Sequence, residues 1–171
     1  PEGKTLEFKQ SLDASEPFLR TAVAFGNTAG GIVLFGVQHR TRRVLGVGDP
    51  LALQERLANL VSDHIRPQLI PEIEILPWRK THVVGVQVYP SSNRPHYLKA
   101  LGPDQGVFVR VGSTNRRADH SVVEELRRQA RTDTFDEQPM TELDSEVLDF
   151  QAASELFSPV RRITQRDLEV L

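Results

Sequence analysis

The sequence predicts an α+β fold, in which a mixed, mostly antiparallel sheet of about six strands packs with about three helices, followed by a short helical C-terminal tail. Three observations favour this class. Several short runs alternate apolar and polar residues with a period of two, which is typical of strands. Longer stretches repeat apolar residues every three or four positions, as amphipathic helices do. The chain has 171 residues, 39% of them hydrophobic, and is long enough to bury a core.

The N-terminal region predicts a strand, a helix and a second strand. Leu6 and Phe8 alternate with charged neighbours in a short strand. Ser15 and Pro17 favour a helix start, and Gly30 and Gly31 favour its end. Residues 32–37 are apolar throughout, which predicts a central strand covered on both faces. The apolar positions of the helix are Phe18, Leu19, Ala22, Val23 and Phe25.

The middle of the chain predicts a basic turn, a helix and a meander. Residues 40–43, RTRR, are expected to form a hairpin turn that leads to a short strand at residues 44–47. Asp49 and Pro50 are typical of a helix start, and Pro67 ends this helix. Residues 72–76 and 83–89 alternate as two strands around a turn at residues 79–81. A further short strand is expected at residues 96–99.

Residues 106–119, GVFVRVGSTNRRAD, predict a strand that leads into a polar turn and two arginines. The alternation puts the valines on one face and Phe108 with Arg110 on the other, so Arg110 is expected to face outward. Residues 112–115 are typical of a turn. Ser121 and Glu124 have capping-box spacing, which predicts a helix from about residue 121 to about residue 131. The buried side of this helix is expected to carry Val122, Val123 and Leu126.

Charge divides the chain into two parts. Residues 1–131 carry 18 Lys and Arg against 13 Asp and Glu, a net charge of +5, and residues 132–171 carry 3 against 10, a net charge of −7. We therefore predict a domain at residues 1–131, followed by an acidic linker and the start of a truncated region at residues 132–171. Because residue 1 is Pro, the chain is expected to be a piece of a longer protein.

The composition favours a cytoplasmic protein without a membrane partner. The chain has no cysteine, no apolar run of membrane length and no leader pattern. Gly30 and Gly31 close a helix and open a strand, whereas a phosphate-binding loop does the reverse, so these glycines do not predict an ATP site. The five histidines never fall at metal-ligand spacing. Ser113 and Thr114 are interpreted as turn residues rather than nucleophiles.

Glu2, Glu7 and Lys9 are the candidate catalytic residues. Sets of acids with a lysine can hold a divalent cation beside a phosphodiester, so Glu2 and Glu7 are also the candidate metal ligands. Their odd spacing puts them on opposite faces of an extended strand unless the chain bends before Leu6. Surface salt bridges are the alternative interpretation.

Arginines in predicted turns and at strand ends are the candidate nucleic-acid contacts. Long cationic side chains at such places reach phosphate backbones without entering a groove, and scattered surface charge is the alternative. Trp78 and Tyr97 are the best candidates for exposed aromatic residues, so base stacking is only weakly indicated. The candidate contacts are Arg40, Arg42, Arg43, Arg94, Arg110, Arg116 and Arg117.

Five ordered motifs over roughly residues 1–131 resemble the Schlafen-type AlbA domain. They are TLEFK (5–9), AFGNTAGGIVLFGV (24–37), ANLVSDHIRPQL (58–69), SSNRPHYLK (91–99) and residues 106–119. Domains of this kind stand at the N-terminus of bacterial proteins labelled as transcriptional regulators or as RecG-like, helicase-related proteins. The resemblance therefore implies a mixed α/β fold and DNA binding.

The resemblance also implies, from the animal Schlafen proteins, a metal-dependent endoribonuclease with three carboxylates. Glu2 and Glu7 match the first two acids. Gln38 and His39 stand where the third is expected, and an amide with an imidazole suits Mg²⁺ less well than a carboxylate. ATP binding is attached to the family as a label. No cofactor is expected here, except Mg²⁺ or Mn²⁺ if the chain is a nuclease.

Three hypotheses follow. The leading one is a non-enzymatic nucleic-acid-binding domain, for DNA in the first place, of a cytoplasmic bacterial regulator or RecG-related protein. The second is a metal-dependent endoribonuclease that uses Glu2 and Glu7. The third is a protein-interaction or homodimerisation module, because exposed strand edges invite pairing.

Overall fold

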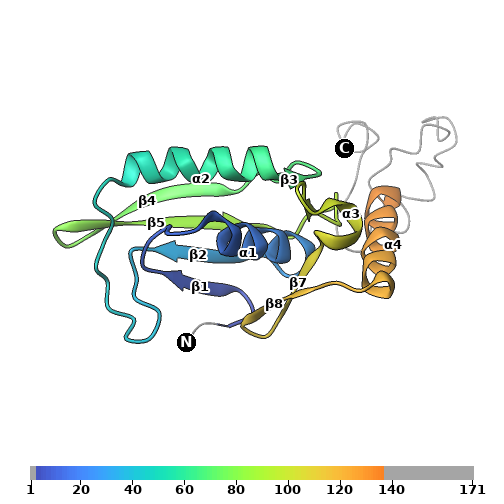
Figure 1. The fold of residues 1–171 in the computed structure, drawn as a ribbon, viewed down its shortest axis with the longest axis horizontal. Coiled ribbons are helices and arrows are strands. Elements are labelled where there is room, and N and C mark those ends of the chain that lie inside the picture. The colour runs from blue at the N-terminus through green and yellow to red at the C-terminus, as the bar shows by residue number, and fades with distance from the viewer. Residues whose placement is uncertain (1–2, 137–171) are drawn as a thin grey trace, which may run out of the picture. The chain divides into compact units, whose positions relative to one another are not determined.

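The computed structural model describes residues 3–136 (Figure 1). They form an α+β fold with a mixed sheet, as the sequence predicts, and have four helices where about three were expected, with the strands divided into sheets of four, two and two. The order of elements is β1 (Leu6–Lys9), α1 (Ser15–Asn27), β2 (Gly31–Phe35), α2 (Pro50–His64), β3 (Ile65–Arg66), β4 (Glu72–Trp78), β5 (Thr81–Val88), β6 (Tyr97–Leu98), α3 (Gly102–Gln105), β7 (Phe108–Val111), β8 (Thr114–Arg117) and α4 (His120–Asp136). The predicted helical tail lies outside the described residues.

The main sheet has four strands in the order β1-β2-β5-β4, in which β1 and β2 are parallel and the other neighbours are antiparallel. The remaining strands form two separate pairs, β3 with β6 and β7 with β8. The predicted strand at residues 44–47 is wrong, because only one bridge forms there, between Val37 and Val44. After that bridge the chain pairs with no single strand, since the Leu45 and Gly46 amides both bond to the Gly36 carbonyl and the Val47 amide bonds to the His82 carbonyl of β5.

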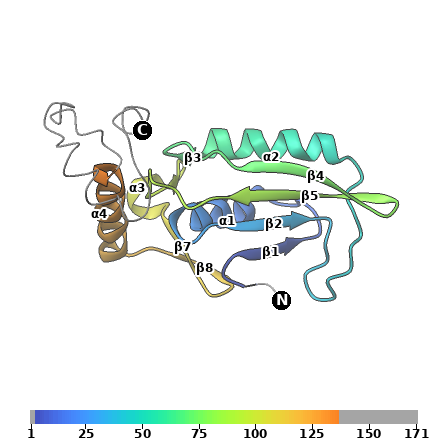
Figure 2. The same ribbon diagram turned by 180° about the vertical axis from the view of Figure 1, so that it is seen from behind.

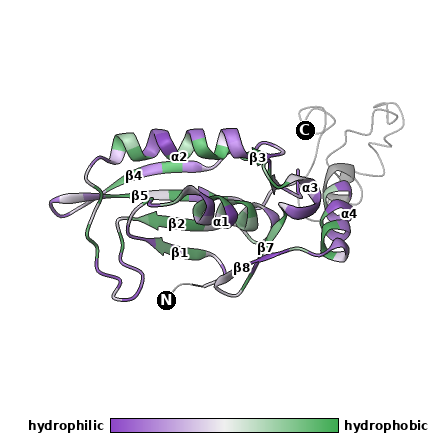
Figure 3. Cartoon of the chain, in the orientation of Figure 1, coloured by the Kyte–Doolittle hydropathy of each residue, from purple (hydrophilic) through white to green (hydrophobic). Residues whose placement is uncertain are grey.

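Both helices that pack on the main sheet, α1 and α2, cover the same face of it (Figures 1 and 2). Val33 and Phe35 of β2 lie in this core with no exposed surface, whereas Ile32 on the other face is 37% exposed. The prediction that residues 32–37 are covered on both faces is therefore wrong. In Figure 3 strand β2 is nevertheless mostly hydrophobic, because its residues GIVLF contain no polar side chain, which is why periodicity did not reveal an open face.

Helix α1 ends at a joint that connects three elements. Gly30 follows it with φ +73° and bonds to the Phe25 carbonyl, so the glycine pair closes the helix as expected. The buried Asn27 donates to the carbonyls of His96 and Phe108 and accepts from the His96 amide. Asn27 thus fixes β6 and β7 against the end of α1.

The β7–β8 hairpin differs from its prediction in phase and length. Phe108 and Arg110 are each 5% exposed while Val111 is 53% exposed, so the expected outward direction of Arg110 is wrong. The reason is tertiary, since β7 packs on α1 and the Arg110 guanidinium lies over the Phe25 ring. The turn contains only Gly112 and Ser113, because residues 114 and 115, expected in the turn, already pair in β8.

Helix α4 packs on this hairpin through Val123 and Leu126, which are buried, and through the partly buried Val122. Its cap is Asp119 rather than Ser121, since the Asp119 carboxylate accepts from the Val122 amide at 2.9 Å. That bond is the main reason why the pKa of Asp119 lies below its ordinary value. The helix continues to Asp136, past the expected end near residue 131. None of the described helices has an apolar stretch that could cross a bilayer.

Candidate nucleic-acid interface

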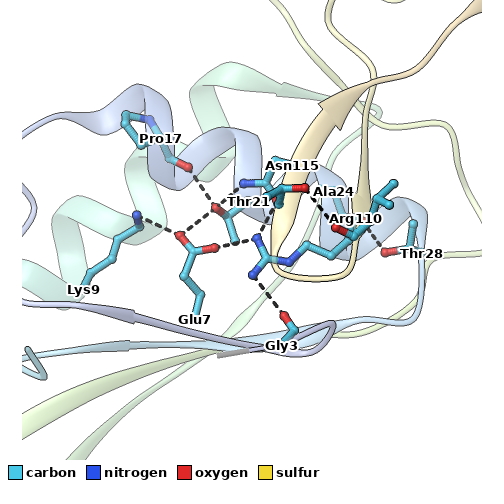
Figure 4. Close-up of polar contacts among 11 residues, drawn as sticks. Gly3, Glu7, Lys9, Pro17, Thr21, Ala24, Thr28, Arg110 and Asn115 are labelled. Carbon is cyan, nitrogen blue, oxygen red and sulfur yellow. Dashed lines mark hydrogen bonds and ion pairs between the residues drawn. The ribbon is translucent and has the colours of Figure 1, made fainter. Parts of the chain in front are cut away.

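A polar network around Glu7 connects β1, α1 and the β7–β8 hairpin (Figure 4). One carboxylate oxygen of Glu7 accepts from the Arg110 guanidinium at 2.7 Å, and the other lies 2.9 Å from the Lys9 ammonium. The Arg110 side chain is 1% exposed and that of Glu7 is 14% exposed. Two cations therefore neutralise one nearly buried carboxylate.

Two uncharged side chains complete the network. Asn115 of β8 accepts from Arg110 at 2.7 Å and donates to the Thr21 hydroxyl of α1 at 2.8 Å. The Thr21 hydroxyl also reaches Glu7 at 3.1 Å and the Pro17 carbonyl at 3.0 Å. A second Arg110 nitrogen donates to the Gly3 carbonyl at 3.1 Å. The network therefore anchors the hairpin to β1 and α1, and the catalytic role of Glu7 and Lys9 stays a prediction.

The described residues do not provide a metal centre at Glu7. Glu2 lies outside the described residues, so its approach to Glu7 stays a prediction. Among residues 3–136 no three His, Asp or Glu side chains gather as metal ligands would. Each Glu7 oxygen already contacts a cation, Lys9 or Arg110, so a divalent cation there would meet charge repulsion from both. The donor set that is described does not fit Mg²⁺, which prefers several charged oxygens.

Three of the candidate arginines lie in one exposed turn after β2, which we call the arginine loop (residues 38–43). The Arg42 amide bonds to the Gln38 carbonyl, and the Gln38 amide bonds to the Arg43 carbonyl, both at 2.9 Å. Thr41 donates to the Gln38 side chain, which closes the turn further. Arg40, Arg42 and Arg43 are all exposed, and none of the ion pairs among the described residues includes them.

The conformation of Arg42 is unusual, since its φ is +58°. A non-glycine residue in this left-handed region costs roughly 1–2 kcal/mol. Arg79, with φ +52°, is the other described non-glycine residue of this kind. The loop thus holds three cations in a fixed turn, in contact with solvent.

The other candidate arginines lie elsewhere. Arg116 and Arg117 are exposed in β8, opposite Val109 and Phe108, and Arg117 donates to the Gln105 side chain. Arg94 is partly buried and lines a groove of about 670 Å³ with Lys4 and Arg110, between α1, β7 and α4. The arginine loop lies near the C-terminal end of β1, because it follows β2 and the Gly36 amide bonds to the carbonyl of Lys9, the last residue of β1. Arg110 of β7 lies near the N-terminal end of β1, because it donates to the carbonyl of Gly3. The structure therefore places the candidate arginines in two groups at opposite ends of β1 (Figure 1).

Sequence reasoning missed Thr21, Asn27 and Asn115 as functional or structural positions. Thr21 and Asn27 are polar residues on the buried side of an otherwise apolar helix, and this is the signal that could have identified them. Asn115 gave no such signal, because asparagine is common in turns. Arg79 and Lys80, which form an exposed turn between β4 and β5, were also not among the candidates.

Comparisons with known proteins agree with this fold. The family model described as "Schlafen, AlbA_2" matches residues 2–119. No curated protein matches the sequence. The solution structure of the N-terminal domain of a protein from Nitrosomonas europaea, described as related to the ATP-dependent DNA helicase RecG, is similar with 27% identity and a TM-score of 0.52, over 66% of this chain and 82% of that one.

A second similar structure, the DIP2311 protein from Corynebacterium diphtheriae, has 18% identity and a TM-score of 0.54 and so supports the fold alone. The match covers 73% of this chain but 27% of DIP2311. The family model, in contrast, spans well over half of the chain and includes β1, the arginine loop and the β7–β8 hairpin. The chain therefore belongs to the Schlafen AlbA_2 family.

Proposed function

We propose that this domain binds nucleic acid, DNA in the first place, through phosphate contacts made by the arginine loop. The observation that carries the proposal is the ordered, exposed turn with Arg40, Arg42 and Arg43, whose charges are not neutralised by described acids. Cations without an acidic partner contribute most to the affinity for phosphates, because an ion pair within the protein would weaken their attraction to the nucleic acid. Arg116 and Arg117 are a second, smaller contact group.

Family membership and the RecG-related relative support a role at nucleic acid, as part of a RecG-related protein, and a transcriptional regulator is the other setting that we propose. Arg110 contributes to this role indirectly. It holds β8 on α1 through Asn115, and β8 carries Arg116 and Arg117. The network around Glu7 supports an interface that is positioned by buried ion pairs and has no reacting group of its own.

The test is a binding titration of labelled DNA followed by fluorescence anisotropy, with variants of equal charge. Replacing Arg40, Arg42 and Arg43 together by Gln is expected to weaken binding of duplex and single strand by at least about tenfold, since each phosphate contact adds affinity. A control removes the same charge from Arg56, Arg127 and Arg128, which lie on α2 and α4. Equal affinities of both triple variants would refute the loop as the interface.

A further inference from the structure

The turn between β4 and β5 lies at the same end of the main sheet as the arginine loop and was not part of the expected interface. Trp78 and Thr81 form the last pair of the ladder, so only Arg79 and Lys80 make the turn. The Val47 amide bonds to the His82 carbonyl at 2.8 Å, and Gly46 approaches Thr81 so closely that a Cβ there would overlap its hydroxyl. The chain that leaves the arginine loop therefore runs against the first residues of β5.

This arrangement brings exposed cations from two turns to the same end of the sheet (Figures 1 and 2). Arg79 in the second turn adopts positive φ, as Arg42 does in the first. Glycine or asparagine is favoured at positions with positive φ, so backbone preference does not explain why both positions carry arginine. The exposed cations at this end are Arg40, Arg42, Arg43, Arg79 and Lys80.

The open face of the sheet offers an aromatic ring at the same end. Trp78 is 48% exposed and follows Leu76, 40% exposed, on the side of β4 that faces away from the helices. Glu72 and Glu74 occupy the same face further along β4. Along β4 this face therefore carries acids at one end and, at the other end, Trp78 next to the turn of Arg79 and Lys80.

We propose that this end of the open face binds single-stranded nucleic acid, with a base stacked on Trp78 and the neighbouring phosphates on the two cationic turns. The inference rests on the proposed function and adds the class of nucleic acid. An aromatic platform flanked by cations is the arrangement that single-strand binders use, and a base can reach the ring only when it is unpaired. The acids on β4 repel the phosphates and so limit the strand to the Trp78 end.

Trp78 is the only tryptophan of the chain, so its fluorescence reports on this position alone. The wild-type protein is titrated with oligothymidylate of about 15 nucleotides, with oligouridylate and with a duplex, because single-strand sites span roughly 4–16 nucleotides. Single strands are expected to quench the Trp78 emission, with saturation at the concentration where the anisotropy of a labelled strand also saturates. The comparison of thymidylate with uridylate separates DNA from RNA as the preferred source.

The variant Trp78→Ala is expected to bind single strands about tenfold more weakly and the duplex as before, whereas Trp78→Phe keeps most of the affinity. Leu51→Ala, which removes another exposed apolar side chain, is the matched control. Single strands that bind without changing Trp78 emission, and equally well to Trp78→Ala, would overturn the inference and leave the proposed function intact. Absence of any anisotropy change with every nucleic acid would instead overturn both.

Discussion

At the scale of single residues, the arginines differ in what surrounds their guanidinium groups. Arg110 is almost fully buried, and Glu7, Asn115 and the Gly3 carbonyl accept its hydrogen bonds. Arg40, Arg42 and Arg43 are exposed to solvent. Desolvated pairs are sensitive to the loss of one partner, while exposed cations contribute little to folding. In the proposed interface Arg110 is therefore a positioning residue, and the arginine loop is the proposed contact surface.

Replacing Arg110 by Ala is expected to lower the free energy of unfolding by about 3–5 kcal/mol, because Glu7 would remain nearly buried without its main cation. Denaturant unfolding measures this, with Arg116→Ala as an exposed control that changes stability by less than about 0.5 kcal/mol. The double variant Glu7→Ala with Arg110→Ala should lose less free energy of unfolding than the sum of the losses in the two single variants.

The opposite pattern would contradict this assignment. An Arg110→Ala protein with wild-type stability but strongly reduced nucleic-acid affinity would make Arg110 a phosphate contact, as the alternation of residues 106–119 predicts. The sequence could not decide between these roles. Both faces of β7 carry apolar residues, so its own sequence does not decide which face is buried. That choice depends on packing against α1, which is distant in the sequence: Asn27 and Phe108, which share a hydrogen bond, are 81 residues apart.

At the scale of elements, long periodic segments were predicted well, and the short strands β3 and β8 were missed. Helices α1 and α2 and strands β4 and β5 have 7 to 15 residues, so their periods are visible in the sequence. Strand β8 has four residues and β3 has two, which is too short for a period. The open sheet face was missed because Leu34 and Leu76 are apolar although they lie on the face that points away from the helices. On that face they flank Gly85, since a Cβ on Gly85 would lie within 3.7 Å of both side chains.

His96, which precedes β6 and is fully buried, connects the end of α1 to the loop after β3. Its Nδ1 lies 2.8 Å from the Pro67 carbonyl, so Nδ1 carries the proton and Nε2 is left buried without a partner. Burial lowers the pKa of His96 below its ordinary value of 6.5. Protonation would place an uncompensated charge in the joint.

The free energy of unfolding is therefore expected to fall as the pH drops below about 6.5, by at most about 1.4 kcal/mol per pH unit for one proton. Stability falls at low pH because His96 in the unfolded chain has the higher pKa and takes up the proton first. The folded state therefore keeps its full stability at a pH above the pKa of His96 in the unfolded chain. Denaturant unfolding between pH 7.5 and 5 measures it, with His96→Asn as the variant that lacks the dependence. The other four histidines are exposed. An identical pH profile for both proteins would contradict the assignment.

At the scale of the whole molecule, the sheet has a covered face that holds the core and an open face that ends at two cationic turns. The net charge of −2 conceals this surface, because the excess of positive charge lies within residues 1–131. Strands β1 and β4 are the edges of the main sheet, so pairing of two copies at an edge stays a prediction of the sequence. Composition indicated a basic domain, but only the fold could show which cations lie together.

The most direct measurement of the central claim is the salt dependence of DNA affinity for the wild type and for the variant with Gln at positions 40, 42 and 43. The logarithm of the association constant should fall linearly with the logarithm of salt concentration, by about 0.9 for each phosphate contact on duplex DNA. Loss of three contacts should then reduce the slope by about 2.7, since 3 × 0.9 = 2.7. An unchanged slope in the variant, or no binding by the wild type at low salt, would contradict the arginine loop as the nucleic-acid interface.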